Sequence, residues 1–171
     1  MATRDKAQPG AAPPRKQSAG ILVYRFSAQN LELLLVHPGG PFWAKKDDGA
    51  WFIPKGEINV DETPLAAAYR EFQEELGIAP PLGEPLELGT VKNKGGKLIY
   101  CWALAGDLDL TAVDSNTFSI EWPPRSGQQR EFPEVDRAAY FSVEAVTQKM
   151  HPAELPLVER LLTRLREQVR P

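Results

Sequence analysis

The sequence has a single cysteine, little net charge and no long apolar run, and each absence narrows the possible functions. Cys101 lies in the apolar run LIYCWAL and has no second cysteine to pair with, so we expect a buried core residue in a reducing cytoplasm. The formal net charge of −3 comes from charges of both signs, which argues against a nucleic-acid duplex as partner. Because no apolar run approaches the length of a bilayer span, no membrane partner is expected.

Length and composition favour one domain behind a short leader. A chain of 171 residues can bury a substantial core as a single domain. Residues 1–17 are rich in Pro, Ala, Gly and basic residues and lack the apolar segment of a secretory signal, which predicts a disordered N-terminal lead. The domain is therefore expected over residues 18–171, including a C-terminal helix, with a cytoplasmic location.

The most informative segment is GEINVDETPLAAAYREFQEELGI, residues 56–78, which contains the start and stop signals of a helix. Thr63 is a good N-cap, Pro64 a good first helical residue, and Gly77 a good stop. Between these signals an apolar stripe recurs at helical spacing, formed by Leu65, Tyr69, Phe72 and Leu76. The pattern predicts a helix with one buried face.

The same helix gathers three carboxylates on a second arc. Glu71, Glu74 and Glu75 fall within about 100° of one another around the helix axis. Such carboxylates repel one another, and a hard divalent cation removes this cost because Mg²⁺ prefers oxygen ligands. An isolated acidic run is usually only a solvated helix face, so the flanking residues decide between the two interpretations.

The flanking residues complete a known signature. Residues 56–78 fit the pattern G-x5-E-x7-R-E-U-x-E-E-x-G-U, where U is bulky and apolar, at Gly56, Glu62, Arg70, Glu71, Phe72, Glu74, Glu75, Gly77 and Ile78. The segment resembles the box of the Nudix hydrolases, and weaker pattern similarity extends over about residues 18–150. The resemblance implies an α/β protein, an α/β/α sandwich around a mixed β-sheet, that hydrolyses nucleoside diphosphates linked to another moiety with Mg²⁺ or Mn²⁺.

The resemblance also implies residue roles. Metal binding falls to the carbonyl of Gly56 and to the side chains of Glu71, Glu74 and Glu75. Arg70 would pair with Glu62 or Glu74 and hold that carboxylate in place, a task that suits its planar guanidinium. Glu62 alternatively serves only as an acid at the start of the helix.

The base that activates water in this family comes from the box or from a glutamate on a later loop. The segment EFPEVDRAAYF resembles that later element, so Glu134 is the first candidate and Glu131 the second; each is alternatively a plain surface acid. Glu131 lies near the end of segment 107–133, and Glu134 directly follows it. This segment is too long for an ordinary connection and is expected to be functional or disordered. Arg125 in this segment is a candidate contact for substrate phosphates.

A second candidate substrate loop covers residues 39–50, beside the box. Lysines neutralise phosphate oxygens, and aromatic rings stack on bases. We therefore take Lys45, Lys46, Lys55 and Trp43 as candidate substrate contacts. The alternative is a solvated charged loop whose tryptophans are anchored in the core.

The remaining pattern indicates alternating strands and helices. Strands are expected over 19–26, 31–38, 51–54, 85–93, 97–106 and 138–141, followed by a helix from Ser142 to about Met150 and a longer tail helix. The apolar stripe of the tail either packs on the sheet or forms a dimer surface, so a monomer or a homodimer is expected.

The predicted function is metal-dependent hydrolysis of a phosphoanhydride bond in a nucleoside polyphosphate, either a nucleoside triphosphate or a dinucleoside polyphosphate. A basic cluster at Lys92, Lys94 and Lys97 suits a substrate with several phosphates. ADP-ribose and inositol pyrophosphates remain alternative substrates. An alternative of another class is a nucleotide-binding sensor of the same fold, although sensors generally lose metal-binding glutamates that this chain keeps.

Overall fold

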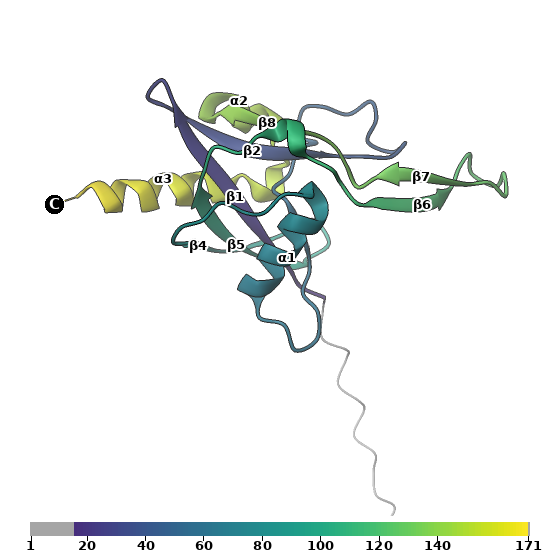
Figure 1. The fold of residues 1–171 in the computed structure, drawn as a ribbon, viewed down its shortest axis with the longest axis horizontal. Helices are drawn as coiled ribbons and strands as arrows, with labels where there is room; N and C mark the ends of the chain where they lie inside the picture. The colour runs from purple at the N-terminus through teal and green to yellow at the C-terminus, as the bar shows by residue number, and fades with distance from the viewer. Residues whose placement is uncertain (1–15, 171) are drawn as a thin grey trace, which may run out of the picture.

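A mixed β-sheet forms the centre of the molecule (Figure 1). The computed structural model describes residues 16–170, so most of the predicted lead over 1–17 lies outside the described residues. The strand order is β4 (Leu86–Lys92), β5 (Leu98–Ala105), β1 (Ser18–Ser27), β2 (Asn30–Pro38) and β8 (Val135–Ser142), with β3 (Lys55–Glu57) paired to β1. Strands β1 and β5 are parallel and the other neighbours are antiparallel, which confirms the mixed sheet.

Helices cover both faces of this sheet. Along β1, Ile21 and Val23 pack on the side of α1 (Pro64–Leu76), while Leu22 packs on the opposite side with α3 (Pro156–Val169). This division follows from the period of two along a strand. The short helix α2 (Val143–Lys149) and the 3₁₀ turns η1 (Leu110–Ala112) and η2 (Pro152–Glu154) complete the elements. The expected α/β/α sandwich is confirmed.

Helix α1 begins and ends at the predicted residues. The hydroxyl of Thr63 accepts a hydrogen bond from the amide of Ala66 at 3.2 Å. Gly77 has φ of +66°, and its amide donates to the carbonyl of Gln73 at 2.8 Å. Because Phe72 and Leu76 are fully buried in the core, the carboxylate arc of the same helix faces outward beside β3.

The predicted strand over 51–54 is wrong. This segment forms only isolated bridges, from Phe52 to Val36 and from Trp51 to Met150, and the regular strand begins at Lys55. Pro54 has no amide proton to donate to a ladder, so the apolar run before it is buried without becoming a strand.

Residues 107–133 form an ordered structure that the sequence did not reveal. They contain η1 and a hairpin of β6 (Thr117–Glu121) and β7 (Gln129–Pro133), in which Phe118 lies opposite Phe132. Strand β6, TFSIE, does alternate polar and apolar residues, but it is only five residues long, and β7, QREFP, has a single large apolar residue, so neither was predicted as a strand.

Burial bears on two expectations about apolar segments, while the choice between monomer and homodimer stays a prediction. Cys101 is 1% exposed and lies in the core between the sheet and α3, as predicted. The tail stripe packs on the sheet through Leu157, Val158 and Leu161. Within residues 16–170, no helix has both the length and the apolar character to span a bilayer.

Candidate active site

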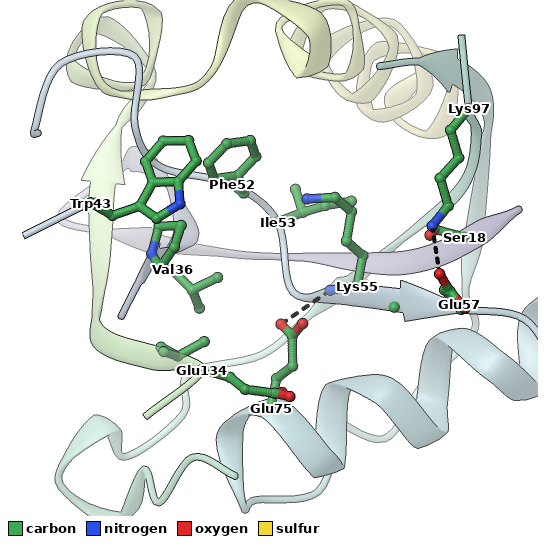
Figure 2. Close-up of a pocket in the computed structure, with 13 residues that line it drawn as sticks. Ser18, Val36, Trp43, Phe52, Ile53, Lys55, Glu57, Glu75, Lys97 and Glu134 are labelled. Atoms are coloured by element: carbon green, nitrogen blue, oxygen red, sulfur yellow. Dashed lines mark hydrogen bonds and ion pairs between the residues drawn. The ribbon is translucent and has the colours of Figure 1, made fainter. Parts of the chain in front are cut away.

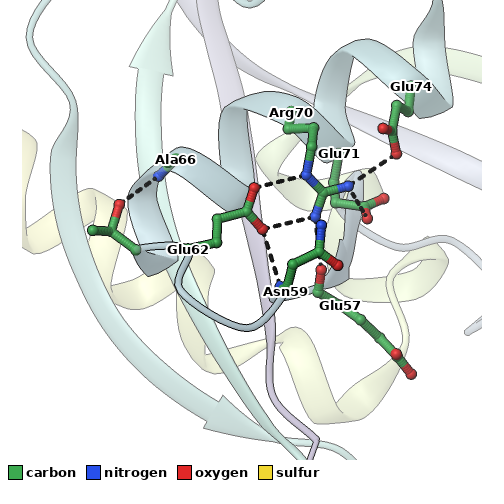
Figure 3. A network of polar contacts seen from close by, with 8 residues as sticks. Glu57, Asn59, Glu62, Ala66, Arg70, Glu71 and Glu74 are labelled. Atoms are coloured by element: carbon green, nitrogen blue, oxygen red, sulfur yellow. Dashed lines mark hydrogen bonds and ion pairs between the residues drawn. The ribbon is translucent and has the colours of Figure 1, made fainter.

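Arg70 is the centre of a polar network on the outer face of α1 (Figure 3). Its Nε and Nη2 donate to the two carboxylate oxygens of Glu62, at 2.8 and 2.9 Å. Nη1 donates to Glu71 at 2.8 Å and to Glu74 at 3.0 Å, and Nη2 also reaches the carbonyl of Glu57 at 2.9 Å. The sequence offered Glu62 or Glu74 as partner, and the structure joins Arg70 to both.

The electrostatics of this network favour its charged form. Hydrogen bonds from Arg70, and then from the amide of Asn59, lower the pKa of Glu62 to about 2. The same carboxylate is the main reason that the pKa of Arg70 lies above its ordinary value. Glu62 therefore stays ionised and fixes the guanidinium, which in turn orients Glu71 and Glu74.

The backbone at Gly56 touches one of the predicted metal ligands. Strand β3 brings this residue so close to α1 that a Cβ atom at position 56 would stand 2.0 Å from Oε2 of Glu71. Only glycine allows this approach. Its predicted role as a carbonyl ligand beside Glu71 agrees with that proximity and stays a prediction.

Two further carboxylates lie at the same place. Oε2 of Glu75 accepts a hydrogen bond from the amide of Lys55 at 3.2 Å. Burial raises the pKa of Glu75 to about 8, and the charges of Glu71 and Glu134 add to that rise. Burial, followed by the charges of Glu71 and Glu74, also raises the pKa of Glu134. Glu134 thus approaches the helix carboxylates from the junction of the hairpin with β8.

This donor set fits a divalent cation. Four carboxylates meet beside a bare backbone, and Mg²⁺ or Mn²⁺ would relieve the repulsion between their charges. Across residues 16–170 no three acidic, His or Cys side chains already stand in a metal-binding arrangement. Arg70 and the amide of Lys55 hold one oxygen each of Glu71, Glu74 and Glu75, which leaves the second oxygen of each carboxylate for a cation. The metal ligands stay a prediction.

A cleft of about 310 Å³ opens beside the carboxylates and has two chemically different ends (Figure 2). Its apolar end is lined by Val36, Pro38, Trp43, Phe52 and Ile53. Its charged part is lined by Glu57 and Lys97 across the pocket from Trp43, and by Glu75 and Glu134 along another side, with Gly56 in the backbone beside them. Trp43 meets Phe52 edge to face, with 5.5 Å between ring centroids, and the two rings form an aromatic wall.

The structure places the candidate substrate contacts unequally. Lys55 and Trp43 line the cleft, and Nζ of Lys55 lies 4.4 Å from the ring centroid of Phe52. Nζ of Lys46 lies 4.9 Å from the Trp43 ring, outside the cleft lining. Lys45 and Arg125 are exposed and are not among the residues that line the cleft, Arg125 being in the turn between β6 and β7. Their contact with substrate stays a prediction.

Glu154 is a site residue that sequence reasoning missed. Its side chain is 2% exposed, and its Oε1 accepts a hydrogen bond from the amide of Ile53 at 2.9 Å. Its Oε2 lies 2.8 Å from Nζ of Lys55. A lone glutamate in a 3₁₀ turn carries no motif, so only the fold reveals that it supports the cleft.

The structure shows the positions of His37, which carried no motif, and of Lys97. His37 is fully buried, with Nδ1 2.7 Å from Asp136 and Nε2 2.6 Å from the carbonyl of Lys46, so it anchors the loop that bears Trp43. Lys97, one of the predicted basic cluster, lies at the cleft with its Nζ 3.4 Å from Glu57.

Residues 14–161 match the family model described as the NUDIX domain. The chain belongs to the NUDIX family. Among curated relatives, this NUDIX chain is 48% identical over 50 residues to an RNA pyrophosphohydrolase of Stenotrophomonas maltophilia (strain K279a), covering 28% of the chain and 24% of that protein. An RNA pyrophosphohydrolase of Xanthomonas campestris pv. campestris (strain B100) is 46% identical over 50 residues, again covering 28% of the chain and 24% of that protein. The chain thus spans about a quarter of the length of these relatives.

Solved structures show the same fold. A binary complex of a C. elegans Ap4A hydrolase superposes with a TM-score of 0.62 at 22% identity, covering 88% of this chain and 99% of that one. The NUDIX domain of Shewanella oneidensis NrtR, complexed with ADP ribose, superposes with a TM-score of 0.63 at 19% identity, covering 94% of each chain.

Proposed function

We propose that this NUDIX protein is a divalent-metal-dependent pyrophosphohydrolase that acts on a nucleoside polyphosphate. The observation that carries the proposal is the two-ended cleft, in which an aromatic wall adjoins a cluster of carboxylates. Aromatic rings take a base, while the carboxylates and their cation take phosphates. The RNA pyrophosphohydrolase and Ap4A hydrolase relatives support substrates of this class.

Residues of α1 and β3 would hold the cation. Glu71, Glu74 and Glu75 would supply carboxylate oxygens and Gly56 its carbonyl. When bound, Mg²⁺ or Mn²⁺ offsets charge on the phosphoryl oxygens and lowers the pKa of a coordinated water. Arg70 keeps Glu71 and Glu74 aligned on the same side of the helix.

Glu134 is the favoured general base. It lines the cleft beside Glu75 (Figure 2), whereas the carboxylate of Glu131 accepts a hydrogen bond from Thr117 on the hairpin. Glu134 takes a proton from water as the water oxygen bonds to phosphorus and the anhydride P–O bond breaks. The leaving phosphate keeps the bond's electron pair, and the ammonium of Lys55 at the cleft wall balances that charge.

In this arrangement, the nucleobase of the substrate binds at the aromatic end of the cleft. Trp43 offers a ring beside Phe52, and the adjoining Val36 and Ile53 exclude water from that end. The phosphates then extend toward Gly56 and Glu75. ADP-ribose, the ligand in the NrtR structure, has the same sequence of base and phosphates and is the alternative substrate.

The test is release of phosphate or pyrophosphate with Mg²⁺ or Mn²⁺ from nucleoside triphosphates, diadenosine polyphosphates, ADP-ribose and an inositol pyrophosphate. Glu74→Gln and Glu75→Gln should each lower kcat by a factor on the order of 100 or more, because each removes a metal ligand, while thermal unfolding changes little. Full activity in both variants would refute the site. Nucleotide binding without turnover by the unmodified protein would instead favour a sensor.

A further inference from the structure

The hairpin β6–β7 contributes no side chain to the hydrophobic core on either face of the sheet. Its strands pair only with each other within the described residues, and it projects from the sheet in Figure 1. Its apolar side chains, which belong to neither core cluster, are Phe118, Ile120, Trp122 and Phe132. Because a two-stranded hairpin alone is marginally stable, it needs a packing partner.

That partner is the start of the Trp43 loop. The ring of Phe42 meets Trp122 edge to face, with centroids 5.6 Å apart and planes at 79°. The Phe118 ring lies so close to Gly40 that a Cβ atom there would be 2.8 Å from it. Phe42 nevertheless remains 66% exposed. The Phe42–Trp122 pair is therefore an ordered aromatic surface that is open to a ligand.

This aromatic pair adjoins the cleft through the backbone. Phe42 precedes Trp43, and the amide of Gly39 donates to the carbonyl of Glu134 at 3.0 Å, which ties the root of the hairpin to the cleft wall. Figure 2 shows Trp43 and Lys97 on opposite sides of the pocket. The hairpin thus extends the aromatic end of the cleft, where the substrate nucleobase would bind, in the direction away from Lys97.

Because the hairpin extends the aromatic end of the cleft and not the phosphate end, its position distinguishes two kinds of substrate. In a dinucleoside polyphosphate, the second nucleoside continues beyond the phosphates and would leave the aromatic end. In a 5′-polyphosphorylated oligonucleotide, the second nucleotide continues from the 3′ oxygen of the first ribose, on the nucleoside side. A hairpin beside Trp43 matches the oligonucleotide.

The chemistry of the surface suits a single strand. Aromatic rings stack on any base, and exposed cations meet the backbone. Lys45 and Lys46 are exposed on the same turn as Phe42, and Arg125 is exposed at the turn of the hairpin. The hairpin also carries Glu121 and Glu131, so its charge is mixed and does not favour a duplex.

We propose that the Phe42–Trp122 pair stacks the second base of a single-stranded oligonucleotide whose 5′-polyphosphate enters the cleft. This inference rests on the proposed function, since the reaction is the same hydrolysis of a phosphoanhydride by water. It adds the substrate class: a strand of at least two nucleotides is preferred over a free nucleoside triphosphate.

The experiment compares kcat/KM for a 5′-triphosphorylated dinucleotide with kcat/KM for the matching nucleoside triphosphate. The unmodified protein should prefer the dinucleotide by roughly tenfold, within the range for one stacked base. Phe42→Ala and Trp122→Ala should lower this preference toward one, chiefly through a higher KM for the dinucleotide. Phe26→Ala is the matched control, because Phe26 is 64% exposed at the far end of β1 and should leave the preference unchanged.

Several results would overturn the proposal. A preference near one in the unmodified protein, with the nucleoside triphosphate still cleaved, refutes the stacking site but leaves the proposed function standing. A preference for diadenosine polyphosphate that falls in Phe42→Ala assigns the pair to a second nucleoside instead. Phe42→Leu, which keeps apolar packing without a stacking ring, must lose the preference as well, or the effect is one of folding. If the protein hydrolyses none of the dinucleotide, the nucleoside triphosphate and the diadenosine polyphosphate, the proposed function itself is refuted.

Discussion

At the scale of single residues, one guanidinium holds several carboxylates of the site through hydrogen bonds. Arg70 contacts Glu62, Glu71 and Glu74, but its strongest partner is Glu62, which it binds through two hydrogen bonds. Glu62 also accepts a hydrogen bond from the amide of Asn59, so its side chain is held in place by the loop that precedes the helix. The two glutamates on the helix are oriented through an arginine that a third glutamate holds.

The pH dependence of stability tests this role of Glu62. Its pKa falls from 4.5 to about 2 on folding, so its contribution is fully present above pH 4.5 and is lost as the pH falls toward 2. We expect Glu62→Gln to lower the free energy of unfolding at pH 7, with a deficit that shrinks between pH 4.5 and 2. Urea denaturation at several pH values measures this, with the exposed Glu84→Gln as control. A deficit that does not change with pH would contradict the assignment.

At the scale of elements, helix α1 is defined by its ends and by what packs against its last turn. Thr63 caps the start, and Gly77 ends the helix in the left-handed conformation. Gly77 also lies against the segment that leads to the hairpin, since a Cβ atom there would be 2.3 Å from the carbonyl of Asp114. The stop of the helix therefore also positions the chain that continues to Glu134.

A pair of alanine substitutions separates these two effects. Gly77 and Gly127 have φ of +66° and +71°, but a Cβ atom at Gly127 meets nothing within 4 Å. We expect Gly127→Ala to cost about 1 kcal/mol, the left-handed penalty alone. Gly77→Ala should cost clearly more because of the clash with Asp114. Equal losses in chemical denaturation would show that the packing at Gly77 is unimportant.

At the scale of the whole molecule, Glu154 connects the turn before α3 to the segment 52–55, which lines the cleft. Its two oxygens hold the amide of Ile53 and the ammonium of Lys55. A buried ion pair gives little net stability over apolar packing, but removing one partner leaves the other charge unpaired. The pair thus fixes the position of Lys55 beside Phe52.

The cost of breaking this pair is measurable. Gln at position 154 keeps an acceptor for the Ile53 amide but loses the charge, so we expect Glu154→Gln to destabilise the protein by about 3 kcal/mol. In a Lys55→Met background the same substitution should cost much less, because no unpaired ammonium remains. Urea denaturation of the four proteins gives both values. The same loss in both backgrounds would mean that Glu154 acts independently of Lys55.

The sequence by itself determined helix α1, its limits, its carboxylate arc and the sandwich fold, because these follow from local spacing and from a complete family signature. Only the tertiary structure decided that 107–133 contains a hairpin, that Glu154 pairs with Lys55, and that Lys97 lines the cleft while Arg125 does not. Helix spacing is set within a few residues, whereas these contacts join residues tens of positions apart, whose meeting depends on how the layers pack.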